Sequence, residues 1–154
     1  MSSSSDHPWI YDVFVSFRGE DTRRSFVSHL YAALTNAGIR TFLDEEELRK
    51  SEELGAGLRR AIEGSRISIV VFSENYAGSS WCLKELVHIM ECQKDIGQVV
   101  LPVFYDVHPS YVRKIFALTV ASKRKKKDKE DMSRWSKALS QVANLSGWDA
   151  KNFR

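Results

Sequence analysis

The chain has 154 residues, of which 43% are apolar and 11% aromatic, which suffices for one hydrophobic core of ordinary domain size but not for two. Its net charge of +3 is too small to imply nucleic-acid binding by overall charge. The two cysteines have the spacing of neither a disulfide framework nor a zinc site, and no apolar run reaches the length of a membrane span. We therefore expect a single domain in a reducing, cytoplasmic setting.

The domain is expected to span residues 10–149. The start, MSSSSDHPW, lacks the basic and apolar regions of a secretory signal, so residues 1–9 are predicted to be a disordered lead. Residues 150–154 are predicted to be a tail or the start of a linker.

Strands and helices alternate along the chain. The strands are predicted from short β-branched and aromatic runs, at YDVFVSF, IRTFL, RISIVVFS and VVLPVFYDV. A first helix, capped by Asp21 or Thr22, is predicted through Asn36, because Phe26, Val27, Leu30, Tyr31 and Leu34 recur at helical spacing. Further helices are predicted to end near Ile62, to span Ser79–Glu91 and to span Arg134–Leu145.

Nearly apolar strands alternating with helices predict an α/β fold of the flavodoxin-like kind. Helices would cover both faces of a parallel sheet of four to five strands, in the order 2-1-3-4-5. In such a sheet, ligands bind beyond the carboxyl ends of the first and third strands, where the winding reverses. Here those ends are Phe17–Glu20 and Phe72–Asn75, and the second leads directly into the helix that starts near Ser79.

Trp81 and Glu85 lie one turn apart at the start of that helix, on a flank separate from its core stripe of Leu83, Leu86, Val87 and Met90. In one interpretation, Trp81 is simply an aromatic residue at the edge of the core and Glu85 an ordinary carboxylate near the start of a helix. The other is a carboxylate beside a flat apolar platform, which suits a ribose that carries a planar cationic base. Such a leaving group needs no proton, so one carboxylate could stabilise the oxocarbenium-like transition state. NAD⁺ contains such a bond.

Four ordered motifs carry a family resemblance: YDVFVSFRGEDTRRSFVSHLYAAL, GIRTFLDEEELRKSEEL, SRISIVVFSENYAGSSWCLKELVHIMEC and VVLPVFYDVHPSYVRK. Together they resemble a plant Toll/interleukin receptor-type (TIR) domain, as found in intracellular immune receptors. The resemblance covers Ile10 to Lys114 and resumes at Arg134. It implies the same fold, self-association, and cleavage of NAD⁺ to products that trigger defence and cell death.

The resemblance also implies residue roles. The catalytic glutamate falls on Glu85 and the stacking tryptophan on Trp81, while Arg18, with Phe17 and Gly19, would hold ligand phosphate or ribose. NAD⁺ would be the substrate, and neither a cofactor nor a metal is expected. The loop after the second strand, Asp44 to Gly57, would close over the site. Its candidate residues are Asp44, Glu47, Leu48 and Ser51, and Ser51 replaces a common glycine, which predicts a stiffer or shifted loop.

Self-association is expected on the first helix. Opposite its core stripe lie Ser25, Ser28, His29 and Ala32, which are small residues around one imidazole. Ser28 and His29 match the Ser-His pair through which members of the family dimerise. The expected partners are further TIR domains of the same or another kind, as a weak homodimer or a higher oligomer. No membrane partner is expected.

The chain departs from the family after Lys114. It reads IFALTVASKRKKKDKED, and no glycine occurs between Gly97 and Gly147, so the second assembly surface of the family is expected to be shortened or rebuilt. The run Lys123–Lys127 could contact nucleic acid or act as a nuclear import signal, although most such runs are solvated loops.

Three functions therefore stay open: an NAD⁺-cleaving signalling domain, a non-catalytic TIR-TIR adaptor, and a nucleic-acid-directed activity. A receiver domain is disfavoured because Phe17-Arg18 and Ser73-Glu74 stand where its acidic residues belong. A dinucleotide dehydrogenase is disfavoured because only Gly19 of a GxGxxG pattern is present. The four histidines are scattered along the sequence.

Overall fold

The computed structural model describes residues 7–22, 26–44, 54–122, 128–143 and 148–149. The described strands form one parallel sheet in the order β2-β1-β3-β4-β5. They are β1 (Tyr11–Ser16), β2 (Thr41–Leu43), β3 (Ser65–Phe72), β4 (Val99–Phe104) and β5 (Trp148–Asp149). The predicted α/β fold and strand order are confirmed.

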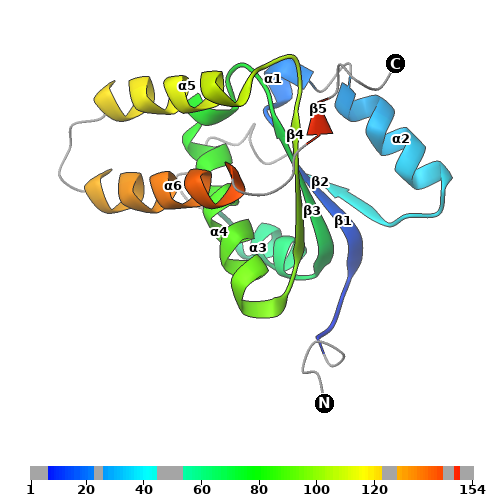
Figure 1. Cartoon of the computed structure of the whole chain (residues 1–154). Helices are drawn as coiled ribbons and strands as arrows, with labels where there is room; N and C mark the ends of the chain where they lie inside the picture. Colours follow the sequence, from blue (N-terminus) through cyan, green and yellow to red (C-terminus); the bar gives the residue numbers. More distant parts are fainter. Residues whose placement is uncertain (1–6, 23–25, 45–53, 123–127, 144–147, 150–154) are drawn as a thin grey trace.

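Helices cover both faces of the sheet (Figure 1). The helical elements are α1 (Gly19–Thr22), α2 (Ser28–Asn36), α3 (Ala56–Glu63), the 3₁₀ turn η4 (Tyr76–Gly78), α4 (Ser80–Ile96), α5 (Pro109–Ser122) and α6 (Asp128–Ala143). In Figure 1, α2 lies on one side of the sheet, and α3, α4, α5 and α6 lie on the other. None of the described helices is long and apolar enough to cross a membrane.

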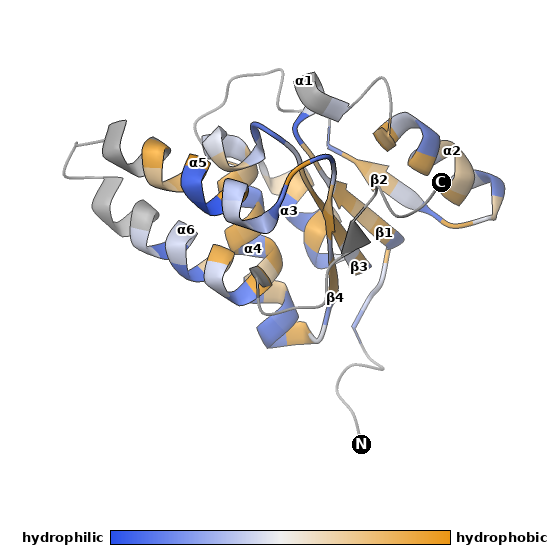
Figure 2. Cartoon of the chain, turned by 45° about the horizontal axis from the view of Figure 1, so that its top comes forward, coloured by the Kyte–Doolittle hydropathy of each residue, from blue (hydrophilic) through white to orange (hydrophobic). Residues whose placement is uncertain are grey.

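The two faces of the sheet build two separate cores. Successive side chains of a strand point to opposite faces, so Val13 and Val15 of β1 pack with Val27 on the α2 side, whereas Phe14 packs on the α4 side. In β3, Ile69 and Val71 likewise pack on the α2 side, whereas Val70 and Phe72 pack on the α4 side. Figure 2 shows the hydrophobic residues concentrated on the strands. By the same alternation Ser16, the last residue of β1, faces α4.

The first predicted helix differs from the observed one. Thr22 does not cap it but lies within the short α1, where its hydroxyl donates to the Arg18 carbonyl at 3.2 Å. The long helix α2 begins only at Ser28 and ends at Asn36 as predicted. Of its predicted core stripe, Val27 is buried and Leu30 and Leu34 are partly buried, but Tyr31 is 39% exposed. Tyr31 therefore lies at the edge of the stripe.

The helix that carries Trp81 and Glu85 is longer than predicted. It continues five residues past Glu91 to Ile96 and ends at Gly97, which has a φ of 73°. Glycine adopts this left-handed conformation without steric cost, so Gly97 is where the helix can stop. Of the predicted stripe Leu83, Leu86 and Met90 are buried, Ile89 is buried with them, and Ser79 caps the amino end.

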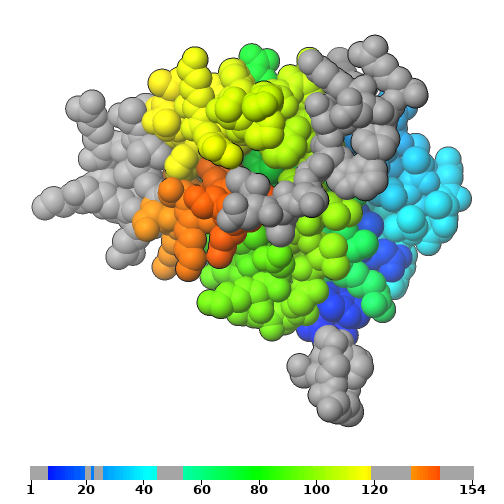
Figure 3. All heavy atoms as spheres, in the orientation of Figure 1, coloured from blue at the N-terminus to red at the C-terminus, as the bar shows by residue number. Residues whose placement is uncertain are grey.

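The segment after β4 forms a helix that the sequence reading did not predict. The fourth strand ends at Phe104, three residues before the predicted end, and Asp106 has a positive φ of 56°. The continuous helix α5 follows, and it packs against η4 and α6. In the space-filling view α5 and α6 lie together on the side of the molecule away from α2 (Figure 3).

The predicted last helix is confirmed in type and position, but it starts earlier. It begins at Asp128 instead of Arg134 and is described to Ala143. Its buried residues are Trp135, Ala138, Leu139 and Val142, which recur at the spacing of one helical face and pack on α4.

Candidate active site

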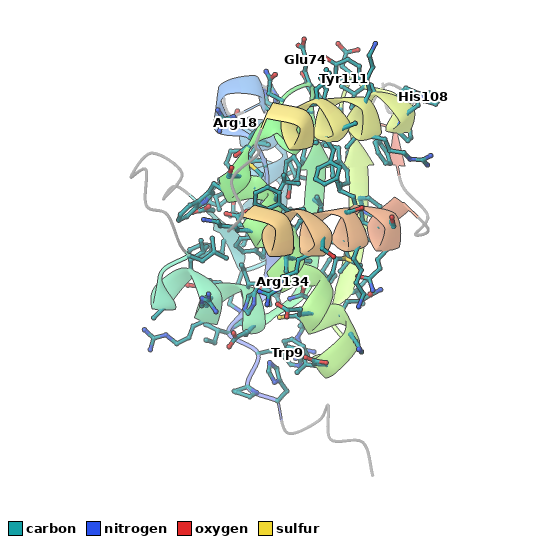
Figure 4. All side chains as sticks on the ribbon, turned by 90° about the vertical axis from the view of Figure 1, so that its left-hand side faces the viewer. Trp9, Arg18, Glu74, His108, Tyr111 and Arg134 are labelled. Carbon is teal, nitrogen blue, oxygen red and sulfur yellow. The ribbon has the colours of Figure 1, made fainter. Side chains whose placement is uncertain are left out.

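The amino end of α4 lies at the carboxyl ends of β1 and β3, where the strand order reverses. The Ser79 hydroxyl caps the helix by accepting from the Cys82 amide at 3.2 Å. It also accepts from an Arg18 guanidinium nitrogen at 3.3 Å. Arg18 follows β1, and Figure 4 shows it beside α1, at the same end of the molecule as Glu74. One serine therefore ties the turn after β1 to the start of α4.

Glu85 lies inside the protein, and only 1% of it is exposed. The Ser16 hydroxyl donates to its carboxylate oxygen Oε1 at 2.7 Å. The phenol oxygen of Tyr76 is 2.7 Å from the same Ser16 oxygen and 3.2 Å from the Cys82 carbonyl. A buried carboxylate costs free energy unless donors meet it; Ser16 of β1 is such a donor, and Tyr76 of η4 contacts that serine.

The Trp81 side chain is held by a residue that follows β2. Its indole nitrogen donates to Asp44 Oδ2 at 2.6 Å, a short hydrogen bond. Asp44 follows β2 and is 4% exposed, and Trp81 is 9% exposed. The indole is thus fixed to the first residue of the loop that was expected to close over the site.

The site gathers acidic groups around one phenol. Burial raises the pKa of Tyr76 well above its ordinary value, and the nearby Cys82, Glu85 and Asp44 raise it further, while the Ser16 hydrogen bond acts in the opposite direction. The phenol therefore stays protonated at neutral pH and can act as a hydrogen-bond donor.

The predicted site residues are only partly brought together. Glu85, Trp81, Arg18 and Asp44 lie around the amino end of α4. The Phe17 side chain points to the opposite face and packs in the α2 core, and only its carbonyl reaches the site, accepting from the Cys82 thiol at 3.7 Å. Gly19 begins α1. The remaining candidates Glu47, Leu48, Ser51 and the run Lys123–Lys127 lie outside the described residues.

The expected open crevice is closed around the carboxylate. Glu85 and Trp81 are both covered, although they lie at the predicted end of the sheet. A hollow of about 320 Å³ lies further along α4, between α3 and α6, and includes Arg59, Lys84, His88 and Arg134 in its lining. Ligand access to Glu85 therefore requires the covering groups to move.

The predicted assembly residues that the structure describes lie at exposed positions of α2. Ser28, His29 and Ala32 are all exposed, and Ser25 lies outside the described residues.

Ser16 and Tyr76 are site residues that the sequence reading missed. Counting by twos from Phe14 along β1 would have placed the Ser16 hydroxyl on the α4 side. No sequence pattern indicates that Tyr76 turns its phenol inward, because η4 is a single irregular turn.

Both cysteines are predicted to be unreactive in the folded protein. Cys82 is fully buried, and burial, together with Glu63, Glu91 and Asp95, raises the pKa of Cys92 to about 12. The thiolate is the reactive form of cysteine. Ellman's reagent at pH 8 should therefore react rapidly with no thiol of the native protein and with two thiols after unfolding in guanidinium chloride. Rapid reaction of either native thiol would contradict the described packing.

Comparison with known proteins identifies the family. The family model described as "TIR domain" matches residues 10–154. The chain belongs to the TIR domain family. This TIR domain is 56% identical over 155 residues to disease resistance protein RPV1 of Vitis rotundifolia, with 96% of the chain and 11% of that protein covered. It is 51% identical to TMV resistance protein N of Nicotiana glutinosa, with 95% of the chain and 13% of that protein covered.

A solved structure agrees with the fold. The TIR domains in the structure of the activated Roq1 resistosome, which directly recognises the pathogen effector XopQ, match this TIR domain with a TM-score of 0.84 at 48% identity. The match covers 93% of this chain and 89% of that one. The predicted resemblance to plant TIR domains is therefore confirmed. The chain spans about an eighth of the length of the two resistance proteins.

Proposed function

We propose that this TIR domain self-associates and hydrolyses NAD⁺ to nicotinamide and ADP-ribose-type products that signal plant defence and cell death. The observation that carries the proposal is Glu85, a buried carboxylate at the strand-order reversal, oriented by Ser16 and flanked by the Trp81 indole. The relatives are plant resistance proteins, which supports a role in immunity for this chain.

The proposed reaction breaks the bond between ribose C1′ and the nicotinamide nitrogen. The bonding electrons leave with that nitrogen, which neutralises its positive charge, and C1′ becomes electron-poor. Glu85 stabilises the resulting positive charge on the sugar. Water then bonds to C1′ and loses a proton, so NAD⁺ and water yield nicotinamide, ADP-ribose and a proton. Trp81 would provide the flat surface for the base, and Arg18 would pair with phosphate or ribose.

The closed state of the site fits an activity that depends on assembly. Glu85 is 1% exposed in the single chain, so an isolated molecule offers NAD⁺ no direct path to it. Contact between α2 faces would provide the free energy needed to favour an open state. The exposed Ser28, His29 and Ala32 are where we place that contact.

Nicotinamide release should rise more steeply than linearly with protein concentration. If association opens the site, activity per molecule increases as the associated fraction increases, and His29→Glu should require higher concentration for the same rate. Chromatographic measurement of nicotinamide over a concentration series, with light scattering on the same samples, checks this. Gln141→Glu on α6 adds the same charge at another exposed position and should leave the curve unchanged.

The exposed α2 face also supports a second candidate function, a non-catalytic module that recruits other TIR domains. The two functions differ in a cell-death assay: the adaptor requires His29 but not Glu85, whereas the hydrolase requires both. A Glu85→Gln variant that signals as strongly as the natural chain would favour the adaptor.

A further inference from the structure

Two hydroxyl groups, those of Tyr76 and Ser16, form a row that leads to Glu85. Tyr76 contacts the Cys82 carbonyl and the Ser16 hydroxyl, and Ser16 contacts Glu85, with oxygen-to-oxygen distances of 3.2, 2.7 and 2.7 Å in that order. Ser16 and Tyr76 are both 0% exposed. The row therefore lies wholly inside the protein, where hydrogen bonds are stronger than in water.

The number of hydroxyl protons indicates which group donates in each of these hydrogen bonds. Each hydroxyl has one proton, and an ionised Glu85 can only accept. Ser16 then donates its hydrogen bond to Glu85, so the Ser16 oxygen can accept one from Tyr76. Tyr76 has one proton and two possible acceptors, the Ser16 oxygen at 2.7 Å and the Cys82 carbonyl at 3.2 Å, and we assign the proton to the shorter contact. Because Tyr76 polarises the Ser16 hydroxyl, Ser16 becomes a stronger donor to the carboxylate.

We propose that Ser16 and Tyr76 are positioning residues for the reaction assigned to Glu85, which hold its carboxylate in one orientation. The inference rests on the proposed hydrolysis of NAD⁺. The last torsion of a glutamate side chain is broad and roughly two-fold, so packing alone does not fix the carboxylate plane. A donor 2.7 Å from Oε1 does fix it. Tyr76 acts one step further away, through Ser16.

The test compares turnover with substrate binding. Ser16→Ala should lower kcat for nicotinamide release by about tenfold, since a hydrogen bond to a charged group is lost, and leave KM within about twofold. Ser16→Thr keeps the hydroxyl and should restore most of kcat. Tyr76→Phe removes a single oxygen and should lower kcat by about threefold, so it serves as the test if the Ser16 variants do not fold.

Ser68→Ala is the matched control. Ser68 is a strand serine on the same side of the sheet, equally 0% exposed, and its hydroxyl donates to Gln98 at 2.9 Å. Its loss should lower the melting temperature without changing kcat. If Ser16→Ala and Tyr76→Phe both keep the natural kcat, or if Ser68→Ala lowers kcat equally, the positioning role is wrong while hydrolysis stands. If the natural chain releases no nicotinamide at any concentration, both proposals fall.

Discussion

Glu85→Gln should reduce nicotinamide release at least about a hundredfold at every protein concentration, because a neutral amide of the same shape cannot stabilise the positive sugar of the transition state. Loss of one such electrostatic group typically costs two to three orders of magnitude in turnover. Glu85→Ala should remove activity to the same extent. Chromatographic assay of nicotinamide, with concentration series for each variant, measures the effect.

Glu85→Gln should not lower the stability of the protein, although it lowers the activity. A carboxylate that is 1% exposed carries a desolvation penalty, and the amide of Glu85→Gln can still accept from Ser16. We expect a melting temperature equal to or above that of the natural chain, as is common where function costs stability. Glu91→Gln, on the same helix but with a side chain 64% exposed, is the control and should change neither quantity. Equal activity of both variants would end the assignment of Glu85.

Trp81→Ala should destabilise the protein by about 3 to 5 kcal/mol, the usual range for truncating a buried tryptophan. It removes a side chain that is only 9% exposed and the partner of Asp44, so Asp44 loses the hydrogen bond that Trp81 donates. Guanidinium unfolding followed by circular dichroism measures the change, since tryptophan fluorescence itself is altered by the substitution.

Trp81→Phe separates the flat surface from the hydrogen bond. The ring remains for the nicotinamide base, but the N–H that donates to Asp44 is lost, so KM should rise less than in Trp81→Ala. Trp135→Phe, which changes a buried indole on α6, should leave KM unchanged. If Trp81→Phe and Trp135→Phe give the same KM, the indole of Trp81 has no role in substrate binding.

The strands were predictable because their side chains are nearly all apolar and few other structures suit such runs. That pattern placed β1 and β3 side by side and so located the amino end of α4 at the reversal of the sheet. Trp81 and Glu85 could be paired from their spacing alone, since residues four apart share one side of a helix. The helix end at Gly97 was also visible in the sequence, although the prediction stopped at Glu91.

The rest depends on contacts between distant segments. Asp44 and Trp81 are 37 residues apart, and Ser16 and Glu85 are 69 apart, so no local spacing reveals either bond. The closure of the site follows from packing around the indole and the carboxylate, which periodicity does not describe. Helix α5 was not predicted, although Val112, Ile115 and Phe116 recur at the spacing of one helical face and pack toward the core.

Strand β1 contacts both cores of the molecule, because its successive side chains point to opposite faces of the sheet. Val13 and Val15 press against the layer of α2, and their neighbours Phe14 and Ser16 press against the layer of α4. Since one backbone carries both sets of side chains, a shift of the strand changes the contacts on both faces. A displacement of β1 by contacts on the α2 side would therefore also move Ser16, the hydrogen-bond donor of Glu85.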